Sequence, residues 1–208
     1  MYRVVETYYR QPVFDFYRAS RNPFYSLTFE LDAAPLKEFL ERHGYPVYLN
    51  LSYFFLRAMQ SLEDFRYRLL DDRIVLYDAI HPGLTYPAAD GLFSFVHFTY
   101  DPDVERFNRA ARDVLPPPDA PASLETLEHT NYVFFTAIPG VPFTSFAHAS
   151  DDPGHGAPRV AFGKFRRDGS RLLVPVGLQV NHLFIDGRAL GELYERAAAV
   201  FSDPAGTF

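Results

Sequence analysis

One histidine stands where a general base could work. His182 follows a strongly apolar predicted strand, Leu172–Val180, and precedes the segment Leu183–Gly187 and an amphipathic helix. A histidine between apolar neighbours at a strand-to-helix turn is partly desolvated, and desolvation favours the neutral imidazole that a base requires. Asp186 lies where the helix begins and can cap it or pair with a cation. A structural histidine would show the same pattern, so the residues alone leave both roles open.

The other six histidines offer weaker chemistry. Four of them lie near predicted turns or on alternating strands, which is typical of surface or structural roles: His43, His81, His97 and His129. His148 and His155 flank Asp151 and Asp152, a set that could offer ligands to a metal. No helical or zinc-type spacing supports such a site, so a solvated loop is the favoured interpretation and no metal is expected.

Composition narrows the class of partner. The 208 residues carry a net charge of −6 without any Lys/Arg-rich run, which argues against nucleic acid and anionic membranes. Apolar runs are too short for a transmembrane helix, and the N-terminus lacks the apolar centre of a signal peptide. Cysteine is absent, which excludes disulfides and thiolate chemistry. A cytoplasmic enzyme is therefore expected. The aromatic share of 17% favours an aromatic core, pocket or subunit interface.

Helices and strands must position these residues. Helical spacing or capping predicts four helices: about 33–43, 48–62, 101–114 and 187–201. Aromatic and β-branched runs predict strands at 67–70, 73–77, 92–99, 132–138, 160–166 and 171–180, with hairpin turns at Asp71–Asp72 and Asp168–Gly169. The proline-rich stretch 115–122 is interpreted as a long surface loop. Strands and helices without a strict βαβ rhythm indicate an α+β layered sheet.

The segment Gln179–Gly187 carries a family resemblance. It contains His182, Asp186 and Gly187 in the order His-x-x-x-Asp-Gly, and so resembles the signature of chloramphenicol acetyltransferases, which other coenzyme A-dependent acyltransferases share more loosely. Further segments resemble the family in the same order, between about residues 12 and 201: Phe14–Arg18, Tyr25–Thr28, Phe65–Arg66, Tyr77–Pro82, Phe93–Ser94, Phe143–Phe146, Gly163–Phe165 and Arg171–Pro175.

The resemblance implies a fold and an assembly. The expected fold is α+β, a two-layer α/β sandwich with a mixed sheet, in which residues 1–208 form a single chloramphenicol acetyltransferase-like domain. The family implies a homotrimer in which each site lies between two subunits. The histidine would come from one subunit, and much of the acceptor pocket from its neighbour.

Catalytic roles follow from the same resemblance. His182 would take the proton from an acceptor hydroxyl, whose oxygen then attacks the thioester carbonyl of acetyl-CoA. Asp186 would be structural and pair with Arg18, fixing the turn that carries His182. Thr136 stands where the family has a serine that donates to the oxyanion. Its hydroxyl is kept, but the added methyl group restricts χ1.

Other positions concern the donor and the acceptor. Lys164 and Phe165 match a lysine and an aromatic residue near the adenosine end of coenzyme A. The family pattern is lost at three places, where this chain has Asn181, Gly140 and Ala161. The segment Tyr86–Leu92 departs from the family's polar pocket segment, so the acceptor wall has changed. Four residues are expected to bind the acceptor: Phe24, Tyr25, Leu92 and Phe135.

The sequence therefore predicts an O-acetyltransferase that moves an acetyl group from acetyl-CoA to a hydroxyl of a small molecule. Chloramphenicol, in an antibiotic-resistance role, is one possible acceptor, and another small hydroxylated molecule is the other. Two alternatives remain. One is a weakly active or non-catalytic homologue that binds a small aromatic ligand, which Thr136, Gly140 and Ala161 would favour. The other is an acyltransferase whose donor is held on an acyl carrier protein or a lipoyl arm.

Overall fold

The strands form two separate sheets of different size. The computed structural model spans residues 1–208 and describes all of them except 126–129, 150–155 and 207–208. The large sheet has the strand order β2-β10-β8-β7-β5-β6, with β9 added beside β10. Its strands are β2 (Phe24–Asp32), β5 (His81–Pro87), β6 (Phe93–His97), β7 (Tyr132–Ile138), β8 (Arg159–Gly163), β9 (Arg166–Asp168) and β10 (Arg171–Asn181). The small sheet has the order β1-β4-β3, with β1 (Tyr2–Val4), β3 (Tyr67–Leu70) and β4 (Arg73–Tyr77).

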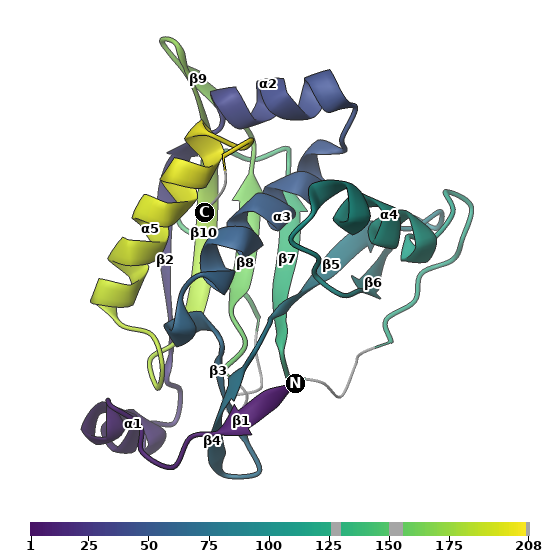
Figure 1. The fold of residues 1–208 in the computed structure, drawn as a ribbon. Coiled ribbons are helices and arrows are strands. Elements are labelled where there is room, and N and C mark those ends of the chain that lie inside the picture. The colour runs from purple at the N-terminus through teal and green to yellow at the C-terminus, as the bar shows by residue number, and fades with distance from the viewer. Residues whose placement is uncertain (126–129, 150–155, 207–208) are drawn as a thin grey trace.

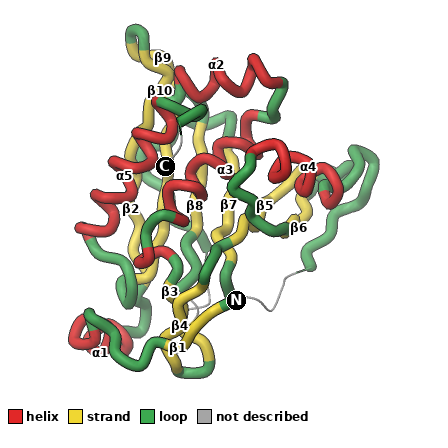
Figure 2. Tube along the Cα trace, in the orientation of Figure 1, coloured by secondary structure: helices red, strands yellow, loops and turns green. Residues whose placement is uncertain are grey.

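The large sheet is mixed. Strands β5, β7 and β8 run parallel to one another, and the other neighbours pair antiparallel. The helices are α1 (Gln11–Arg18), α2 (Ala34–His43), α3 (Val47–Gln60), α4 (Val104–Val114) and α5 (Gly187–Ser202). Figures 1 and 2 show α2, α3 and α5 lying together on one face of this sheet. The expected α+β class, a two-layer sandwich with a mixed sheet, is confirmed.

The hydrophobic core fills the space between the helices and the sheet. Helix α3 is apolar on nearly all sides and is buried along most of its length, as its composition predicts. Strand β10 is buried from Leu173 to Asn181 because it lies inside the sheet, with β2 and β8 as neighbours. This burial makes β10 a rigid support for the turn that follows it, which carries His182.

Local signals explain most element ends. Gly44 ends α2 with a left-handed backbone (φ 66°), and Asp186 caps α5 by accepting a hydrogen bond from Ala189 N at 3.0 Å. Asp71 and Asp72 both have positive φ, as a tight hairpin between β3 and β4 requires. Helix α4 begins at Val104, later than the expected 101, because Asp103 is its capping residue. Helix α1 and the strands β1, β2 and β5 were not predicted.

A fully buried arginine joins the two sheets. Arg68 on β3 is 0% exposed and donates hydrogen bonds to the carbonyl oxygens of Phe65, Tyr67, Thr130 and Tyr132. Burial lowers the pKa of its guanidinium to about 9, so the group stays charged at neutral pH. The bonds to Thr130 and Tyr132 tie β3 to the start of β7, which lies in the large sheet.

Candidate active site

The turn after β10 fixes the backbone of His182. The His182 N–H donates to the carbonyl of Pro23 at 2.9 Å, which ties the turn to the segment before β2. The side chain of Asn181 is fully buried, and its Oδ1 accepts from Leu183 N at 2.9 Å. Asn181, one of the expected departures from the family, thus has a structural role as the internal cap of this turn.

Two tyrosine rings pack against the His182 imidazole. Tyr17, from α1, stacks on it with ring centroids 4.0 Å apart and 12° between the planes. Tyr25, from β2, lies at 4.7 Å with the rings tilted by 38°, and its hydroxyl donates to the carbonyl of Ile185 at 3.2 Å. Burial raises the pKa of Tyr25 to about 12, so this hydroxyl stays protonated. The ring of His182 is therefore in contact with both tyrosine rings, and its Nδ1 is buried without a hydrogen-bond partner among the described residues.

Arg10 holds the segment between His182 and α5. Its guanidinium donates to the carbonyl of Phe184 at 2.6 Å and lies 3.2 Å from the Asp186 carboxylate. Burial opposes ionisation of Asp186, but the Ala189 N–H and the charges of Arg10 and Arg188 outweigh it and hold the pKa of Asp186 below its usual value. Asp186 is therefore a carboxylate that caps α5 and pairs with Arg10.

Arg18 is not the partner of Asp186, so that expectation was wrong. Arg18 lies in the last turn of α1 and donates to Asp72 at 2.8 Å on the surface. Arg10 precedes α1, and this position turns its side chain inward. Only 9% of Arg10 is exposed, against 44% of the Arg18 side chain. The ion pair that the resemblance implies is present, but another arginine of the same segment supplies it.

A second carboxylate extends this network. Asp64 accepts a hydrogen bond from the hydroxyl of Tyr9 at 2.6 Å and pairs with Arg188 at 3.2 Å. It also lies 4.0 Å from Arg10. The network joins the segment before α1, the segment after α3 and the first turn of α5. Three separate segments of the chain therefore hold the turn that carries His182.

Thr136 lies far from His182 in the same chain. Its hydroxyl contacts that of Thr85, on β5, at 2.9 Å. Thr136 on β7 pairs with Ala161 on β8, and Ala161 pairs with Gly177 on β10. His182 follows Gly177 by five residues, so it lies two strands away from Thr136 and five residues further along. At about 3.3 Å per residue, this separates them by roughly 17 Å along the strands. A single copy of the chain therefore does not bring the two groups to one reacting atom.

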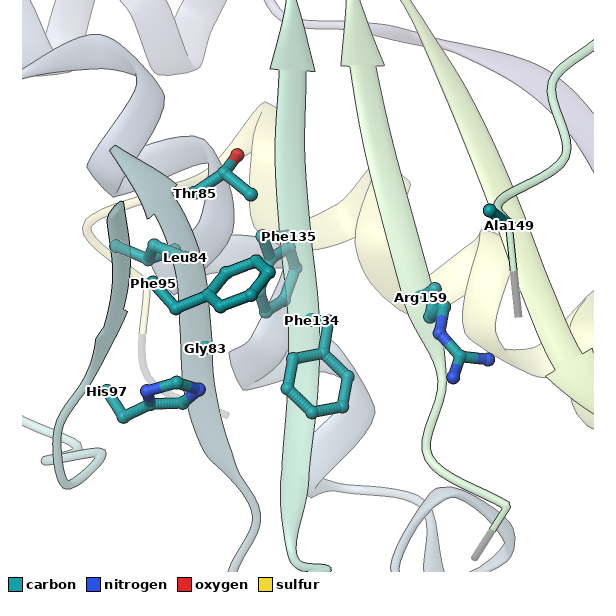
Figure 3. Close-up of a pocket in the computed structure, with 9 residues that line it drawn as sticks. All are labelled: Gly83, Leu84, Thr85, Phe95, His97, Phe134, Phe135, Ala149 and Arg159. Carbon is teal, nitrogen blue, oxygen red and sulfur yellow. The ribbon is translucent and has the colours of Figure 1, made fainter. Parts of the chain in front are cut away.

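A cavity of about 300 Å³ opens on the sheet face opposite the helices (Figure 3). Its lining includes Thr85, Phe95, His97, Phe134 and Arg159. Burial lowers the pKa of His97 below its usual value, so its imidazole is neutral at pH 7. His97 was expected to be structural, but the structure places it in this cavity. His43 and His81 do hydrogen-bond to backbone groups, whereas His129 lies outside the described residues.

The four expected acceptor residues do not form one wall. Phe24 lies beneath the guanidinium of Arg159, 5.3 Å from ring centroid to Cζ, whereas Tyr25 faces His182. Phe135 borders the cavity, but its ring is 1% exposed and stacks on Phe162 in the core. Leu92 is 63% exposed on the turn after β5 and is not among the residues of the cavity lining. The bonds of this turn explain its position, since Leu92 N donates to Asp90 and Leu92 O accepts from Ala88.

Lys164 and Phe165 line a different cavity, of about 290 Å³, on the helix side of the sheet. Tyr48 and Leu51 of α3 and the strand residue Ala137 form its apolar wall, and Lys37 is a second lysine of its lining. The cavity thus combines an apolar wall with two ammonium groups, of which that of Lys37 is ion-paired with Glu41. It lies at the C-terminal ends of β7 and β8. This end of the sheet is the one near Thr136, and His182 lies at the opposite end.

Two further findings concern metals and membranes. Among the described residues, no group of three or more His, Cys, Asp or Glu side chains could hold a metal ion. Asp151, Asp152 and His155, part of the metal-like set in the sequence, lie outside the described residues. In the part of the chain that the structure describes, no helix has both the length and the apolar character needed to cross a bilayer.

The chain resembles proteins of known activity over almost its whole length. A family model described as chloramphenicol acetyltransferase matches residues 2–196. Chloramphenicol acetyltransferase 3 of Escherichia coli is 27% identical over 187 residues, 88% of either chain. A chloramphenicol acetyltransferase of Bacillus pumilus is 25% identical over 206 residues, 93% of this chain and 90% of the relative. A solved chloramphenicol acetyltransferase structure matches with a TM-score of 0.88 and 28% identity, covering 97% of this chain and 100% of that one.

Proposed function

Because this chain belongs to the chloramphenicol acetyltransferase family of acyltransferases, we propose that it transfers the acetyl group of acetyl-CoA to a hydroxyl of a small molecule. Chloramphenicol is the first acceptor to test, since the relatives carry its name. The observation that carries the proposal is the His182 imidazole, which packs against Tyr17 and Tyr25 beside a turn held by the Arg10–Asp186 ion pair.

His182 acts as the general base. Its Nδ1 is buried, so Nε2 is the nitrogen that takes the proton of the acceptor hydroxyl. The acceptor oxygen attacks the thioester carbonyl carbon, and the carbonyl oxygen becomes an oxyanion to which the Thr136 hydroxyl donates. When the intermediate collapses, the C–S bond breaks and the imidazolium returns the proton to the sulfur. The products are the acetyl ester and coenzyme A.

Each active site is built by two copies of the chain. His182 and Thr136 lie at opposite ends of their strands, so one copy supplies the base and its neighbour supplies Thr136 and the acceptor cavity. A closed homotrimer satisfies this arrangement at every interface. Acetyl-CoA enters by the cavity at Lys164 and Phe165, where the ammonium groups of Lys164 and Lys37 meet its phosphates.

The test is a thiol-release assay with acetyl-CoA and chloramphenicol, followed by a panel of other alcohols. Acceptor-dependent release is expected from the wild type and from His43→Ala, a surface histidine that serves as control, but not from His182→Ala. Release that persists in His182→Ala would refute the base. No release with any acceptor, despite coenzyme A binding, would favour a ligand-binding homologue. Release only from a carrier-bound acyl group would favour the carrier-dependent alternative.

Mixed oligomers test the shared site. His182→Ala and Thr136→Val chains should each keep no more than about 1% of the wild-type activity alone. When they are mixed in equal amounts and reassembled, about a quarter of the interfaces pair an intact His182 with an intact Thr136. Activity should therefore return to roughly a quarter of the wild-type value. A mixture that stays inactive would show that each site belongs to one chain.

A further inference from the structure

The imidazole of His97 lies over the backbone of Gly83 in the wall of the acceptor cavity (Figure 3). His97 on β6 pairs with Gly83 on β5, and a Cβ atom at Gly83 would lie only 3.0 Å from His97 Cδ2. The absence of a side chain at Gly83 therefore lets the imidazole lean inward over β5, toward Phe134. His97 thus projects into the cavity rather than away from the sheet.

Both ring nitrogens of His97 lack a hydrogen-bond partner among the described residues. The imidazole meets Tyr132 and Phe134 edge to face, with ring centroids 5.0 and 6.2 Å apart, and these contacts leave the nitrogens unpaired. Neither nitrogen is sealed from solvent. The hydrogen-bonding groups of this side chain therefore stay accessible to a molecule in the cavity.

The other polar side chains of the lining already have partners. Among the described lining residues these are Thr85 and Arg159. The Thr85 hydroxyl contacts that of Thr136 at 2.9 Å, and the Arg159 guanidinium donates to Gln179 Oε1 at 3.5 Å. Within the described lining, His97 is therefore the side chain that can form a hydrogen bond with a ligand without giving up another.

A neutral imidazole offers one donor and one acceptor. Burial lowers the pKa of His97, so at neutral pH one ring nitrogen carries a hydrogen and the other has a free lone pair. A hydroxyl or an amide, which can both donate and accept, fits such a group in either tautomer. An apolar group in the same place would remove water from the imidazole without replacing its hydrogen bond, which is unfavourable.

The geometry points to an acceptor alcohol that carries a second, uncharged hydrogen-bonding group at the opposite end of an aromatic ring, where that group bonds to His97. This inference rests on the proposed function and names the class of its acceptor. The aromatic ring belongs in the middle because Phe95 lies between Thr85 and His97 (Figure 3). Phe95 pairs with Thr85 and precedes His97 by two residues, so its ring offers a stacking surface there.

The distance from His97 to the threonine hydroxyls sets the length of this acceptor. The His97 ring lies over Gly83, and Thr85 follows Gly83 by two residues on the same face of β5, which is roughly 7 Å. The acceptor hydroxyl reacts beside Thr136, whose hydroxyl contacts that of Thr85. A benzene ring with two substituents opposite each other suits this spacing, and a cavity of about 300 Å³ holds such a molecule.

The test compares 4-hydroxybenzyl alcohol with 4-methylbenzyl alcohol, which have nearly the same shape but carry a hydroxyl and a methyl group at the far end. Only the ester on the benzylic oxygen is counted, after chromatographic separation of the products. We expect the wild-type oligomer to use the hydroxyl compound with at least about tenfold higher kcat/KM, because the methyl compound leaves the imidazole unpaired. Acetylation mainly on the phenolic oxygen, or equal use of the two alcohols, would overturn the inference.

Variants of His97 assign the preference to its imidazole. His97→Phe keeps an aromatic ring without hydrogen-bonding groups, so the ratio of the two kcat/KM values should fall to about one or below. His97→Gln, which keeps a donor and an acceptor, should give a ratio between these values. The control His43→Phe makes the same exchange at an exposed site in α2 and should keep the wild-type ratio. A preference that His97→Phe leaves unchanged would contradict the inference.

Calorimetric binding of the same two alcohols separates this inference from the proposed reaction. If no acetyl transfer occurs, but the hydroxyl compound binds more tightly and loses that advantage in His97→Phe, the polar site stands and the transferase proposal fails. If both alcohols are acetylated and neither binding nor turnover depends on the far hydroxyl, the proposed function stands and this inference fails. Matching thermal unfolding midpoints of His97→Phe and wild type confirm that the variant is folded.

Discussion

The imidazole of His182 lies flat against the phenol ring of Tyr17, with 4.0 Å between the ring centroids. The contact joins the helix α1 to the turn after β10, two segments that are more than 160 residues apart in the chain. The hydrogen bond of the His182 N–H fixes only the backbone, and the stacking restricts the rotation of the ring. Tyr17 is therefore a positioning residue for the proposed base.

Replacing Tyr17 by leucine should lower kcat by ten- to a hundredfold, because a ring displaced by about 1 Å loses its alignment with the acceptor hydroxyl. Tyr17→Phe keeps the stacked ring and should retain most of the activity. The KM for acetyl-CoA should stay within about twofold in both variants, since the coenzyme cavity lies at the other end of the sheet. Equal losses in the phenylalanine and leucine variants would show that the hydroxyl, rather than the stacking, matters.

Arg10→Met should destabilise the protein by about 3–5 kcal/mol, since it leaves Asp186 and the Phe184 carbonyl without their buried partner. In a chain of this size the thermal midpoint should fall by roughly 6–20 °C. Arg18→Met is the matched control and should shift it by no more than about 2 °C, because its ion pair is on the surface. A larger effect at Arg18 than at Arg10 would contradict the ion-pair assignment.

The partner of Asp186 shows what the sequence could and could not predict. The Asp186 cap at the start of α5 and the apolar strand before His182 are local signals, and the sequence predicted both. The choice between Arg10 and Arg18 depends on where α1 begins, and a helix of eight residues has little periodicity to reveal it. Pro12 near its N-terminus was the available signal.

The acceptor cavity was beyond local reasoning for a different reason. His97, Gly83, Phe134 and Arg159 belong to four strands, and only their register brings them together. Alternating patterns predict which face a residue occupies but not which residue lies beside it on the next strand. Leu92 was assigned to the pocket because its segment had changed, although the turn there projects into solvent.

A pH-dependent stability is expected from His148. Burial, with a smaller effect of the Arg159 charge, lowers the pKa of His148 from its usual 6.5 to about 4, and its Nε2 is buried without a partner among the described residues. Between these pH values the unfolded chain binds a proton that the folded chain does not, so stability falls as the pH drops from about 6.5 to 4. Wild type should lose more thermal stability between pH 7 and 5 than His148→Gln. His43→Gln, at an exposed site, should behave like wild type; identical pH profiles of all three proteins would refute the prediction.

Gly83→Ala should harm both stability and acceptor binding. The added Cβ would force the rings of Phe134 and His97 apart, which costs about 1–3 kcal/mol and narrows the cavity between them. The KM for the acceptor should rise at least about threefold, with the KM for acetyl-CoA unchanged. Gly191→Ala, on the exposed face of α5 where a Cβ meets nothing within 4 Å, should instead stabilise the protein by up to about 1 kcal/mol. Unchanged acceptor kinetics in Gly83→Ala would show that the acceptor lies elsewhere.

The 2.9 Å contact between the Thr85 and Thr136 hydroxyls allows a test of the oxyanion donor. If Thr136 donates to the oxyanion, its oxygen must accept from Thr85, which then aims it. Thr136→Val should lower kcat by 10²–10³, whereas Thr136→Ser should retain activity within about tenfold. Thr85→Val should cost about tenfold in kcat alone, because it removes only the group that aims the donor.

The double variant decides whether the two threonines act as a unit. With Thr136 already replaced by valine, Thr85 has no donor left to aim, so Thr85→Val should cause little further loss of kcat. Losses that simply multiply would mean that each hydroxyl contacts the substrate independently. A Thr85→Val variant slower than Thr136→Val would reverse their roles and make Thr85 the oxyanion donor.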